Sequence, residues 1–325
     1  MKSISYKKIS DFLIFGGGEI ITDICLFLKK RRKKIIVIAS KQQANDFIQS
    51  KKMKLKNFLN KNKIKLIIIN KNDNKWINLV KKHTFGISHS HRWIFEKDQI
   101  KKFDNKLINF HYSNLPAFRG AGGLTWNILT KRYISGSTIH LVNKKIDMGF
   151  SLMTRSFSFP KKIRSSLSEM QNYSLLIQKK FIIKFLTRLL KGSSFQLKAI
   201  SNDKDSFYWP RLNTKKNAWI NWNWHARDIV DFINAFSKPY EGAATQIEKN
   251  VVRFTEANFL NTKIKFHPFQ YGLIFRKTAK KIYVAANQGI VVINIMNNDY
   301  KGKYLGKRLF SSLKNLEQSF KLVRI

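Results

Sequence analysis

The chain has 325 residues, 43% of them hydrophobic, and its 62 Lys and Arg residues outnumber 19 Asp and Glu residues to give a net charge of +43. This length and apolar content suit one large or two moderate folded domains and argue against a disordered chain. One cysteine excludes an internal disulfide and a multi-cysteine metal site, and the polar start and short apolar runs predict a cytoplasmic protein without a signal peptide or membrane span.

Five short apolar runs in the first third of the chain are typical of buried strands. They cover residues 12–15, 35–39, 66–69, 85–88 and 107–110. Segments that can form helices lie between them, at residues 19–30, 42–60, 73–82 and 96–103. Because strands that alternate with helices pair in parallel and are covered on both faces, we predict an α/β fold with a mostly parallel sheet.

The middle of the chain predicts the end of this sheet and a long helix. The next elements expected are a helix at residues 126–131 and strands at 137–142 and 151–157. Ser166 and Glu169 then match a capping box, in which each side chain satisfies a free backbone N–H group. Apolar residues recur at helical spacing from 175 to 189, and Gly192 is a suitable stop.

The last third of the chain differs in character. Pro210 and the Asn- and Lys-rich stretch after it indicate a linker. A helix at residues 226–236 precedes short β-like runs at 251–254, 281–286 and 290–295. We therefore predict a first domain over residues 1–200, a linker over 201–223 and a small β-rich domain over 224–325.

The most informative segment begins at the end of the fifth strand. Asn109 and His111 are two residues apart there, so the period of a strand places both side chains on one face. Asp147 ends a loop that follows the next strand, and it precedes Gly149. Open α/β sheets bind ligands at the carboxyl ends of their strands. Each residue alone also has a plain structural explanation as a turn former or a buried histidine, so the combination carries the hypothesis.

The combination resembles the signature of folate-dependent formyltransferases, a family that includes sugar N-formyltransferases and methionyl-tRNA formyltransferase. That signature runs Asn-x-His-x-Ser-x-Leu-Pro-x-x-Arg-Gly, then a Gly-x-Thr-x-His strand and an Asp-x-Gly turn. The matching residues are Asn109, His111, Ser113, Leu115, Pro116, Arg119, Gly120, Gly136, Thr138, His140, Asp147 and Gly149. The resemblance implies a Rossmann-like domain followed by a small barrel-like domain, and 10-formyltetrahydrofolate as the formyl donor.

By the same resemblance, Asn109, His111 and Asp147 are the catalytic residues. Formyl transfer needs a neutral donor beside the oxygen that becomes negative, and the Asn109 amide suits this role. It also needs a base poised near neutral pH, for which His111 fits, and Asp147 can orient that histidine.

The resemblance also implies which residues line the pocket. Residues expected to contact the folate are Ser88, His89, Ser90, Trp93, Ile94, Leu141 and Ile146. Residues expected to contact the acceptor are Ser113, Arg119, Gly120 and Trp126. We expect no metal site, because His89 and His91 lack a third ligand.

Two acceptor amines compete within the family. Trp126 and the short region after Ala39 resemble the branch that formylates nucleotide-linked amino sugars, which we favour. The charge of +43 favours methionyl-tRNA instead, because tRNA is a polyanion, although Lys, Asn, Ile and Phe are abundant together as in AT-rich genomes. Hydrolysis of the formyl donor, a non-catalytic RNA-binding role and a homodimer also stay open.

Overall fold

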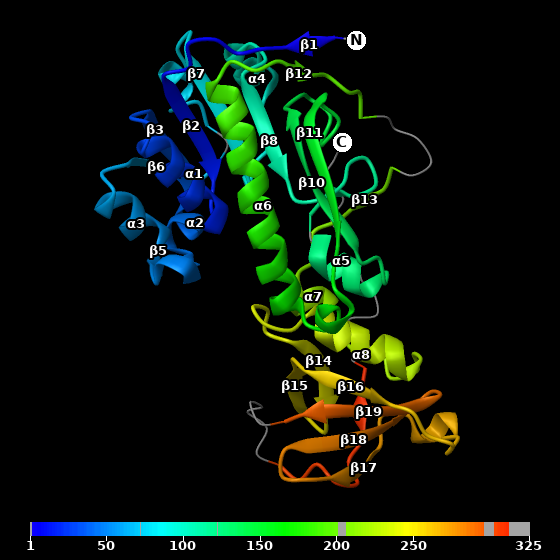
Figure 1. The fold of residues 1–325 in the computed structure, drawn as a ribbon. Helices are drawn as coiled ribbons and strands as arrows, with labels where there is room; N and C mark the ends of the chain where they lie inside the picture. The colour runs from blue at the N-terminus through cyan, green and yellow to red at the C-terminus, as the bar shows by residue number, and fades with distance from the viewer. Residues whose placement is uncertain (1, 72, 122, 201–205, 296–301, 312–325) are drawn as a thin grey trace.

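The computed structural model describes residues 2–71, 73–121, 123–200, 206–295 and 302–311. Its centre is a seven-stranded sheet with the strand order β11-β10-β8-β7-β2-β3-β6 (Figure 1). In that order, the strands are Ser151–Ser158, Ile134–Leu141, Leu107–His111, Thr84–His89, Asp11–Gly16, Lys34–Ser40 and Lys65–Ile69. The five strands from β8 to β6 are parallel, and β10 and β11 add an antiparallel edge.

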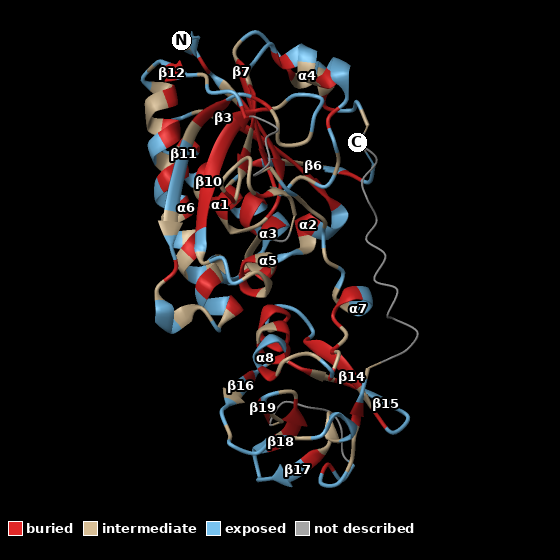
Figure 2. Cartoon of the chain, turned by 90° about the vertical axis from the view of Figure 1, so that its right-hand side faces the viewer, coloured by how far each residue is buried: buried red, intermediate tan, exposed pale blue. Residues whose placement is uncertain are grey.

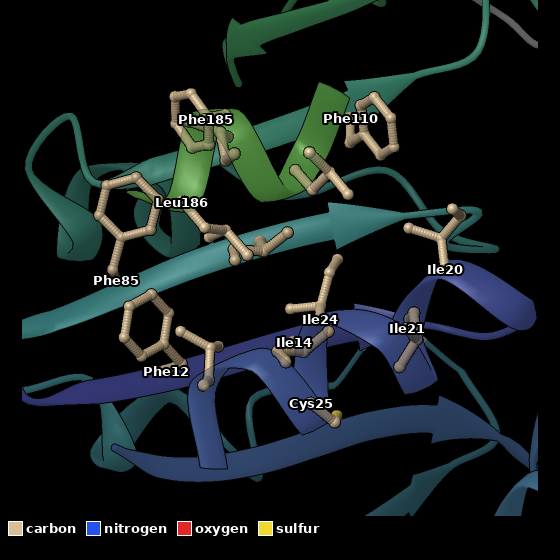
Figure 3. Packing of buried hydrophobic residues seen from close by; sticks show 14 of the residues in the cluster. Phe12, Ile14, Ile20, Ile21, Ile24, Cys25, Phe85, Phe110, Phe185 and Leu186 are labelled. Carbon is tan, nitrogen blue, oxygen red and sulfur yellow. The ribbon is translucent and has the colours of Figure 1, made fainter. Parts of the chain in front are cut away.

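Both faces of the central parallel strands are buried, as alternate residues of β2 show by entering different cores. Phe12 and Ile14 of β2 pack against α1 and α6, together with Cys25 (Figure 3). Leu13 and Phe15 pack on the opposite face, beside α4. The helices of this part are α1 (Glu19–Lys29), α2 (Lys41–Asn45), α3 (Leu55–Lys61), α4 (Lys97–Phe103), α5 (Gly123–Leu129) and α6 (Leu167–Leu190). The predicted mostly parallel sheet with helices on both faces is confirmed.

Two regions expected to form helices are helical only in part, because tertiary contacts override local propensity. The region 42–60 is broken after α2 by a β4–β5 hairpin (Phe47–Ile48 and Met53–Lys54) with a left-handed turn at Lys52. The region 73–82 contains a single helical turn, Ile77–Leu79. Trp76 is 1% exposed there and meets the Phe15 ring edge-on at 4.7 Å, so its burial decides the local conformation.

The remaining short elements connect the parts of the first half. They are β1 (Ser3–Ile4) with β12 (Phe195–Gln196), β9 (Arg119–Gly120) with β13 (Tyr208–Trp209), and helical turns at Gln49–Lys51 and Lys161–Ile163. The predicted cap of the long helix is present in part, because the Ser166 hydroxyl accepts the Glu169 N–H at 3.3 Å.

The C-terminal part is β-rich, as predicted. It contains α7 (Thr214–Asn217), α8 (Ala226–Ala235), β14 (Ala243–Ile247), β15 (Asn250–Phe254), β16 (Ala257–Leu260), β17 (Ile274–Lys277), β18 (Lys281–Ala286), β19 (Gly289–Asn294) and β20 (Leu309–Phe310), with a helical turn at Pro268–Gln270. Three strands form one sheet in the order β15-β14-β20, and four form another in the order β16-β19-β18-β17.

The core of the C-terminal part continues into the first half. Figure 2 shows buried strands in both parts, with exposed residues on the outer surfaces of their helices. Ile128 of α5 and Leu167 and Met170 of α6 belong to the same buried cluster as the C-terminal strands. The division at residues 200 and 223 therefore stays a prediction. Within the described ranges, every helix is too short or too polar to cross a lipid bilayer.

Candidate active site

Two paired strands carry most of the side chains of the candidate site. Along β8, Phe110 enters the buried core, while its neighbours Asn109 and His111 face the opposite side and line a cavity. The antiparallel strand β10 places His140 opposite Asn109 and Thr138 opposite His111. The sheet therefore brings a second histidine beside the predicted amide.

Asp147 reaches this group through a loop that turns back onto the sheet. Its backbone lies in the left-handed region, with φ of 55°. Gly149 allows the close approach, because a Cβ there would lie 1.7 Å from the carbonyl oxygen of Leu141. The backbone N–H of Gly120 donates to Oδ2 of Asp147 at 2.9 Å. The position of the carboxylate is therefore fixed by the tight turn that Gly149 allows and by the N–H of Gly120.

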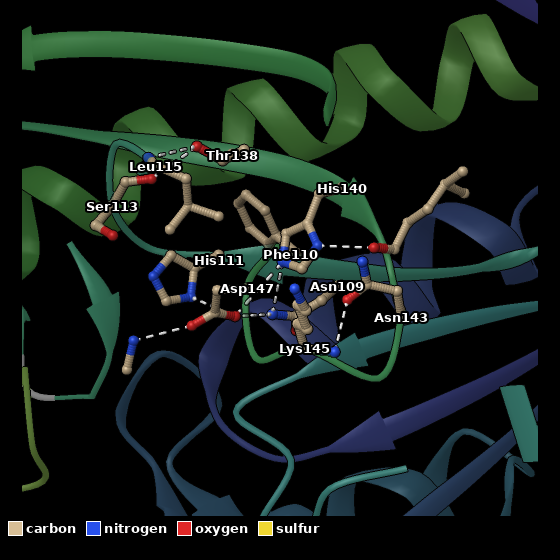
Figure 4. Close-up of polar contacts among 12 residues, drawn as sticks. Asn109, Phe110, His111, Ser113, Leu115, Thr138, His140, Asn143, Lys145 and Asp147 are labelled. Carbon is tan, nitrogen blue, oxygen red and sulfur yellow. Dashed lines mark hydrogen bonds and ion pairs between the residues drawn. The ribbon is translucent and has the colours of Figure 1, made fainter. Parts of the chain in front are cut away.

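Oδ1 of Asp147 is the common neighbour of three side chains (Figure 4). It lies 3.4 Å from Nδ2 of Asn109, 3.6 Å from Nδ1 of His111 and 3.6 Å from Nε2 of His140. The three predicted catalytic residues therefore meet. His140 joins them although our candidate list did not include it. Its signal was present in the sequence, in the match to the Gly-x-Thr-x-His strand.

The carboxyl group of Asp147 is ionised at neutral pH. Burial acts to raise its pKa, but the His111 and His140 imidazoles and the Gly120 N–H outweigh burial and hold the pKa well below its ordinary value.

The hydrogen bonds of His111 indicate which nitrogen can act as a base. Nε2 lies 2.8 Å from the carbonyl oxygen of Phe118, which can only accept, so this nitrogen carries the proton in the neutral ring. The Ser113 hydroxyl donates to the same oxygen at 2.5 Å. The free lone pair is then on Nδ1, which faces Asp147. Ser113 thus supports the loop carbonyl that orients His111.

A cavity of about 1270 Å³ opens in front of this group. Of the residues predicted to contact folate or acceptor, those that line it are Ser88, His89, Ser90, Trp93, Ile94, Ile146, Ser113, Arg119 and Gly120. Leu141 is instead a buried core residue, 7% exposed, whose backbone bonds to Phe150 and to the His140 ring. Its expected contact with folate stays a prediction.

Trp126 is not among the described residues that line the cavity, so its expected contact with the acceptor stays a prediction. Its ring packs on Trp209 with centroids 4.8 Å apart, and its Nε1–H donates to the carbonyl oxygen of Pro210 at 3.0 Å. The large indole is used to hold the segment around Pro210 against α5. Sequence matching located the residue but not the direction of its side chain.

The other wall of the cavity comes from the segment after residue 205. Strand β13 pairs in parallel with β9, so Tyr208 lies beside Arg119 and Trp209 beside Gly120. The Trp209 indole N–H donates to the carbonyl oxygen of Ala117 at 3.2 Å. Further lining residues at this end are Arg211, Lys216, Phe236 and Tyr240. The cavity therefore has aromatic and cationic groups beyond the cluster of Asn109, His111, His140 and Asp147.

His89 forms part of the floor near the end of β7. Burial lowers its pKa to about 4, although its hydrogen bond to the Phe110 carbonyl acts in the opposite direction and His111 adds a further lowering. Nδ1 lies 3.0 Å from that carbonyl and therefore carries the proton. His89 is thus neutral at pH 7. Among the described residues, no group of three or more His, Cys, Asp or Glu side chains could hold a metal ion.

Comparison with known families finds two matching models. The formyl transferase model matches residues 8–169, and the formyl transferase C-terminal domain model matches residues 213–313. A curated relative, the bifunctional polymyxin resistance protein ArnA of Wigglesworthia glossinidia brevipalpis, is 28% identical over 77% of this chain and 39% of its own length. The methionyl-tRNA formyltransferase of Clostridium novyi is 26% identical over 62% of both chains. The matched parts thus span less than two thirds of these relatives.

A solved structure shows a similar fold. The N-formyltransferase from Helicobacter canadensis, in complex with folinic acid and dTDP-3-aminofucose, has a TM-score of 0.67 and 22% sequence identity. The match covers 88% of this chain and 99% of that chain. The order of a mostly parallel sheet followed by a β-rich part is therefore shared with a complete solved structure.

Proposed function

Because the chain belongs to the formyl transferase family, we propose that it moves a formyl group from 10-formyltetrahydrofolate to the amino group of a nucleotide-linked amino sugar. The observation that carries the proposal is the meeting of Asn109, His111 and Asp147 within 3.4 to 3.6 Å at the wall of a large cavity. These three side chains supply a neutral donor, a base and an ionised carboxylate, which are the groups that formyl transfer requires.

The cavity suits a folate at the end formed by the loop after β7. Trp93, Ile94 and Ile146 offer apolar surface there. Nδ1 of His91 is buried without a hydrogen-bond partner among the described residues, so it can meet a polar atom of a ring. The volume of about 1270 Å³ exceeds the roughly 300–1,000 Å³ of ordinary ligand pockets and leaves space for a second substrate.

The chain's own residues then perform three tasks. When bound, 10-formyltetrahydrofolate supplies the formyl carbon, whose bond to the donor nitrogen breaks as its bond to the acceptor amine forms. Asn109 donates a hydrogen bond to the formyl oxygen as negative charge develops on it. His111 takes the amine proton at Nδ1 and returns it to the departing donor nitrogen. Asp147 stabilises the imidazolium while that proton is held.

The other end of the cavity supports an acceptor that carries phosphate and a planar base. Arg211 and Lys216 are cations of the kind that bind phosphate oxygens, and Trp209 and Tyr240 offer flat aromatic surface. The solved N-formyltransferase from Helicobacter canadensis, which is complexed with dTDP-3-aminofucose, supports the same acceptor class. Methionyl-tRNA is the second candidate, favoured by the Clostridium relative and by the net charge of +43.

A panel of acceptors tests the proposal. The protein is supplied with 10-formyltetrahydrofolate and, separately, dTDP-3-aminofucose, methionyl-tRNA or buffer alone, and release of tetrahydrofolate and formylation of each acceptor are measured. We expect formylation of the amino sugar. Transfer only to methionyl-tRNA, with an affinity that falls steeply with salt, would establish the second candidate. Release of formate in buffer alone would show a hydrolase, and an absence of turnover would contradict formyl transfer.

A further inference from the structure

His140 is a buried histidine beside the catalytic group for which the mechanism above has no role. It is 3% exposed and lies at the register shift between β10 and β11. Its Nδ1 is 2.9 Å from the carbonyl oxygen of Leu141, and its Nε2 is 3.3 Å from Nδ2 of Asn109. Both ring nitrogens are therefore in hydrogen-bond range of a specific partner.

The protonation pattern of this group follows from the ionised carboxylate. Because Asp147 can only accept, the atom of Asn109 that lies 3.4 Å from it must be the amino nitrogen rather than the carbonyl oxygen. Nε2 of His140 faces the same amino nitrogen at 3.3 Å, and in the neutral ring whose Nδ1 donates to the Leu141 carbonyl this nitrogen accepts. The ring proton is then on Nδ1, which agrees with the Leu141 carbonyl as its acceptor.

The distances also allow one N–H group of Asn109 to serve both acceptors. Asn109 Nδ2 lies 3.4 Å from Asp147 Oδ1 and 3.3 Å from His140 Nε2, and these two acceptors are 3.6 Å apart. These distances place the two acceptors about 65° apart as seen from Nδ2, whereas the two N–H bonds of an amide diverge by about 120°. A single N–H that lies between the two acceptors is about 33° from each and can be shared by both, which leaves the second N–H for another acceptor.

We propose that His140 is a positioning residue for Asn109. With Asp147, its Nε2 lone pair holds one N–H of the amide and so directs the other N–H into the cavity, toward the oxygen that becomes negative. This inference rests on the proposed formyl transfer. Without the Nε2 acceptor, the amide rotates more freely about its last torsion, and the second donor is presented less often in the reactive direction.

Two substitutions separate this role from simple support of the loop. In His140→Asn, the shorter side chain keeps a donor near Nδ1 for the Leu141 carbonyl but loses the acceptor near Nε2. In His140→Gln, the longer side chain reaches the place of Nε2 and offers an acceptor oxygen there. If His140 only supports Leu141, His140→Asn should keep more of the kcat than His140→Gln. If His140 positions Asn109, His140→Gln should keep more.

The measurements are kcat and KM for 10-formyltetrahydrofolate, with the acceptor that the unaltered chain uses, together with binding of 5-formyltetrahydrofolate. For His140→Asn we expect kcat to fall about 30-fold or more, by the usual weight of an oxyanion donor, with KM and binding within about threefold. For His140→Gln we expect kcat within about fivefold of the unaltered chain. Introduced into Asn109→Ala, His140→Asn should change the residual kcat by less than about twofold, because its target is absent.

Several results would overturn the inference. These are an unchanged kcat in His140→Asn, an equal loss in both variants, a loss that multiplies in the Asn109→Ala background, or failure of both variants to bind 5-formyltetrahydrofolate. The last result would mean that His140 is needed for folding alone. An unaltered chain that binds 5-formyltetrahydrofolate but forms no product with any acceptor would count against the proposed function instead.

Discussion

The backbone N–H of Gly120 donates a hydrogen bond of 2.9 Å to Oδ2 of Asp147, which joins the proposed catalytic carboxylate to a loop 27 residues earlier in the chain. The same glycine pairs with Trp209 in the short β9–β13 ladder. Asp147 is therefore connected through one residue to the cavity wall at the proposed acceptor end. A substitution in that wall can therefore shift Asp147 without contacting it directly.

Gly120→Ala should destabilise the protein and lower kcat. The φ of Gly120 is +90°, and a Cβ there would lie 2.4 Å from the Trp209 carbonyl oxygen, so the strand pairing must shift. We expect a loss of about 1–3 kcal/mol in the free energy of unfolding, measured by urea denaturation. Gly123→Ala is the matched control, because its nearest atom would lie 3.9 Å away. Equal effects of the two substitutions would contradict the role of Gly120.

His111→Ala should lower kcat by about a hundredfold or more, because the amine proton then has no base within the catalytic group. Binding of 5-formyltetrahydrofolate should change little. His83→Ala is the control, since His83 does not line the cavity. A near-normal rate for His111→Ala would place the base on another residue.

Asp147→Asn should lower kcat and also flatten the dependence of stability on acid. The pKa of Asp147 is lowered in the folded protein, so its ionised form stabilises the fold above about pH 4, the ordinary carboxyl pKa, and this contribution is lost as pH falls further. The difference in Tm between the unaltered chain and Asp147→Asn should therefore shrink between pH 7 and pH 3. Asp104→Asn, at an exposed carboxylate, serves as the control. A constant difference across this range would show that the charge of Asp147 does not stabilise the fold.

His89→Asn should make the protein less sensitive to mild acid. The pKa of His89 is lowered to about 4, so protonation favours the unfolded chain, and stability that is complete above about pH 6.5 is lost as pH falls toward 4. This group alone should cost about 3 kcal/mol at pH 4. Asn can keep the donor to the Phe110 carbonyl while removing the titration. Urea denaturation at pH 7 and pH 4 measures the difference, and an unchanged pH slope would refute it.

Arg211→Ala should raise the KM for a phosphate-bearing acceptor about tenfold and leave kcat within about twofold, because the side chain contributes to binding rather than to the chemical step. Arg155→Ala, exposed and outside the cavity lining, should change neither constant. Steady-state kinetics with dTDP-3-aminofucose measure both. If Arg211→Ala leaves KM unchanged, the acceptor phosphate lies elsewhere in the cavity.

Much of the fold follows from local patterns. Short apolar runs are typical of strands in a covered parallel sheet, so β2, β3, β6, β7 and β8 are visible in the sequence. The helix predicted at residues 73–82 forms only in part, for the opposite reason. Helical propensity is a weak preference, and the burial of a side chain as large as Trp76 outweighs it. That burial depends on Phe15, which lies far away in the chain.

The candidate site also has features that the sequence predicts and features that only the tertiary structure shows. By itself, the sequence determined that Asn109 and His111 share one face of a strand, because side-chain direction in a strand alternates with a period of two. Only the tertiary structure decided that Asp147 meets them, that His140 completes the group and that Trp126 packs against Trp209. These facts depend on a left-handed turn, a strand pairing and a packed indole, whose energies come from residues distant in sequence and cannot be summed from local spacing.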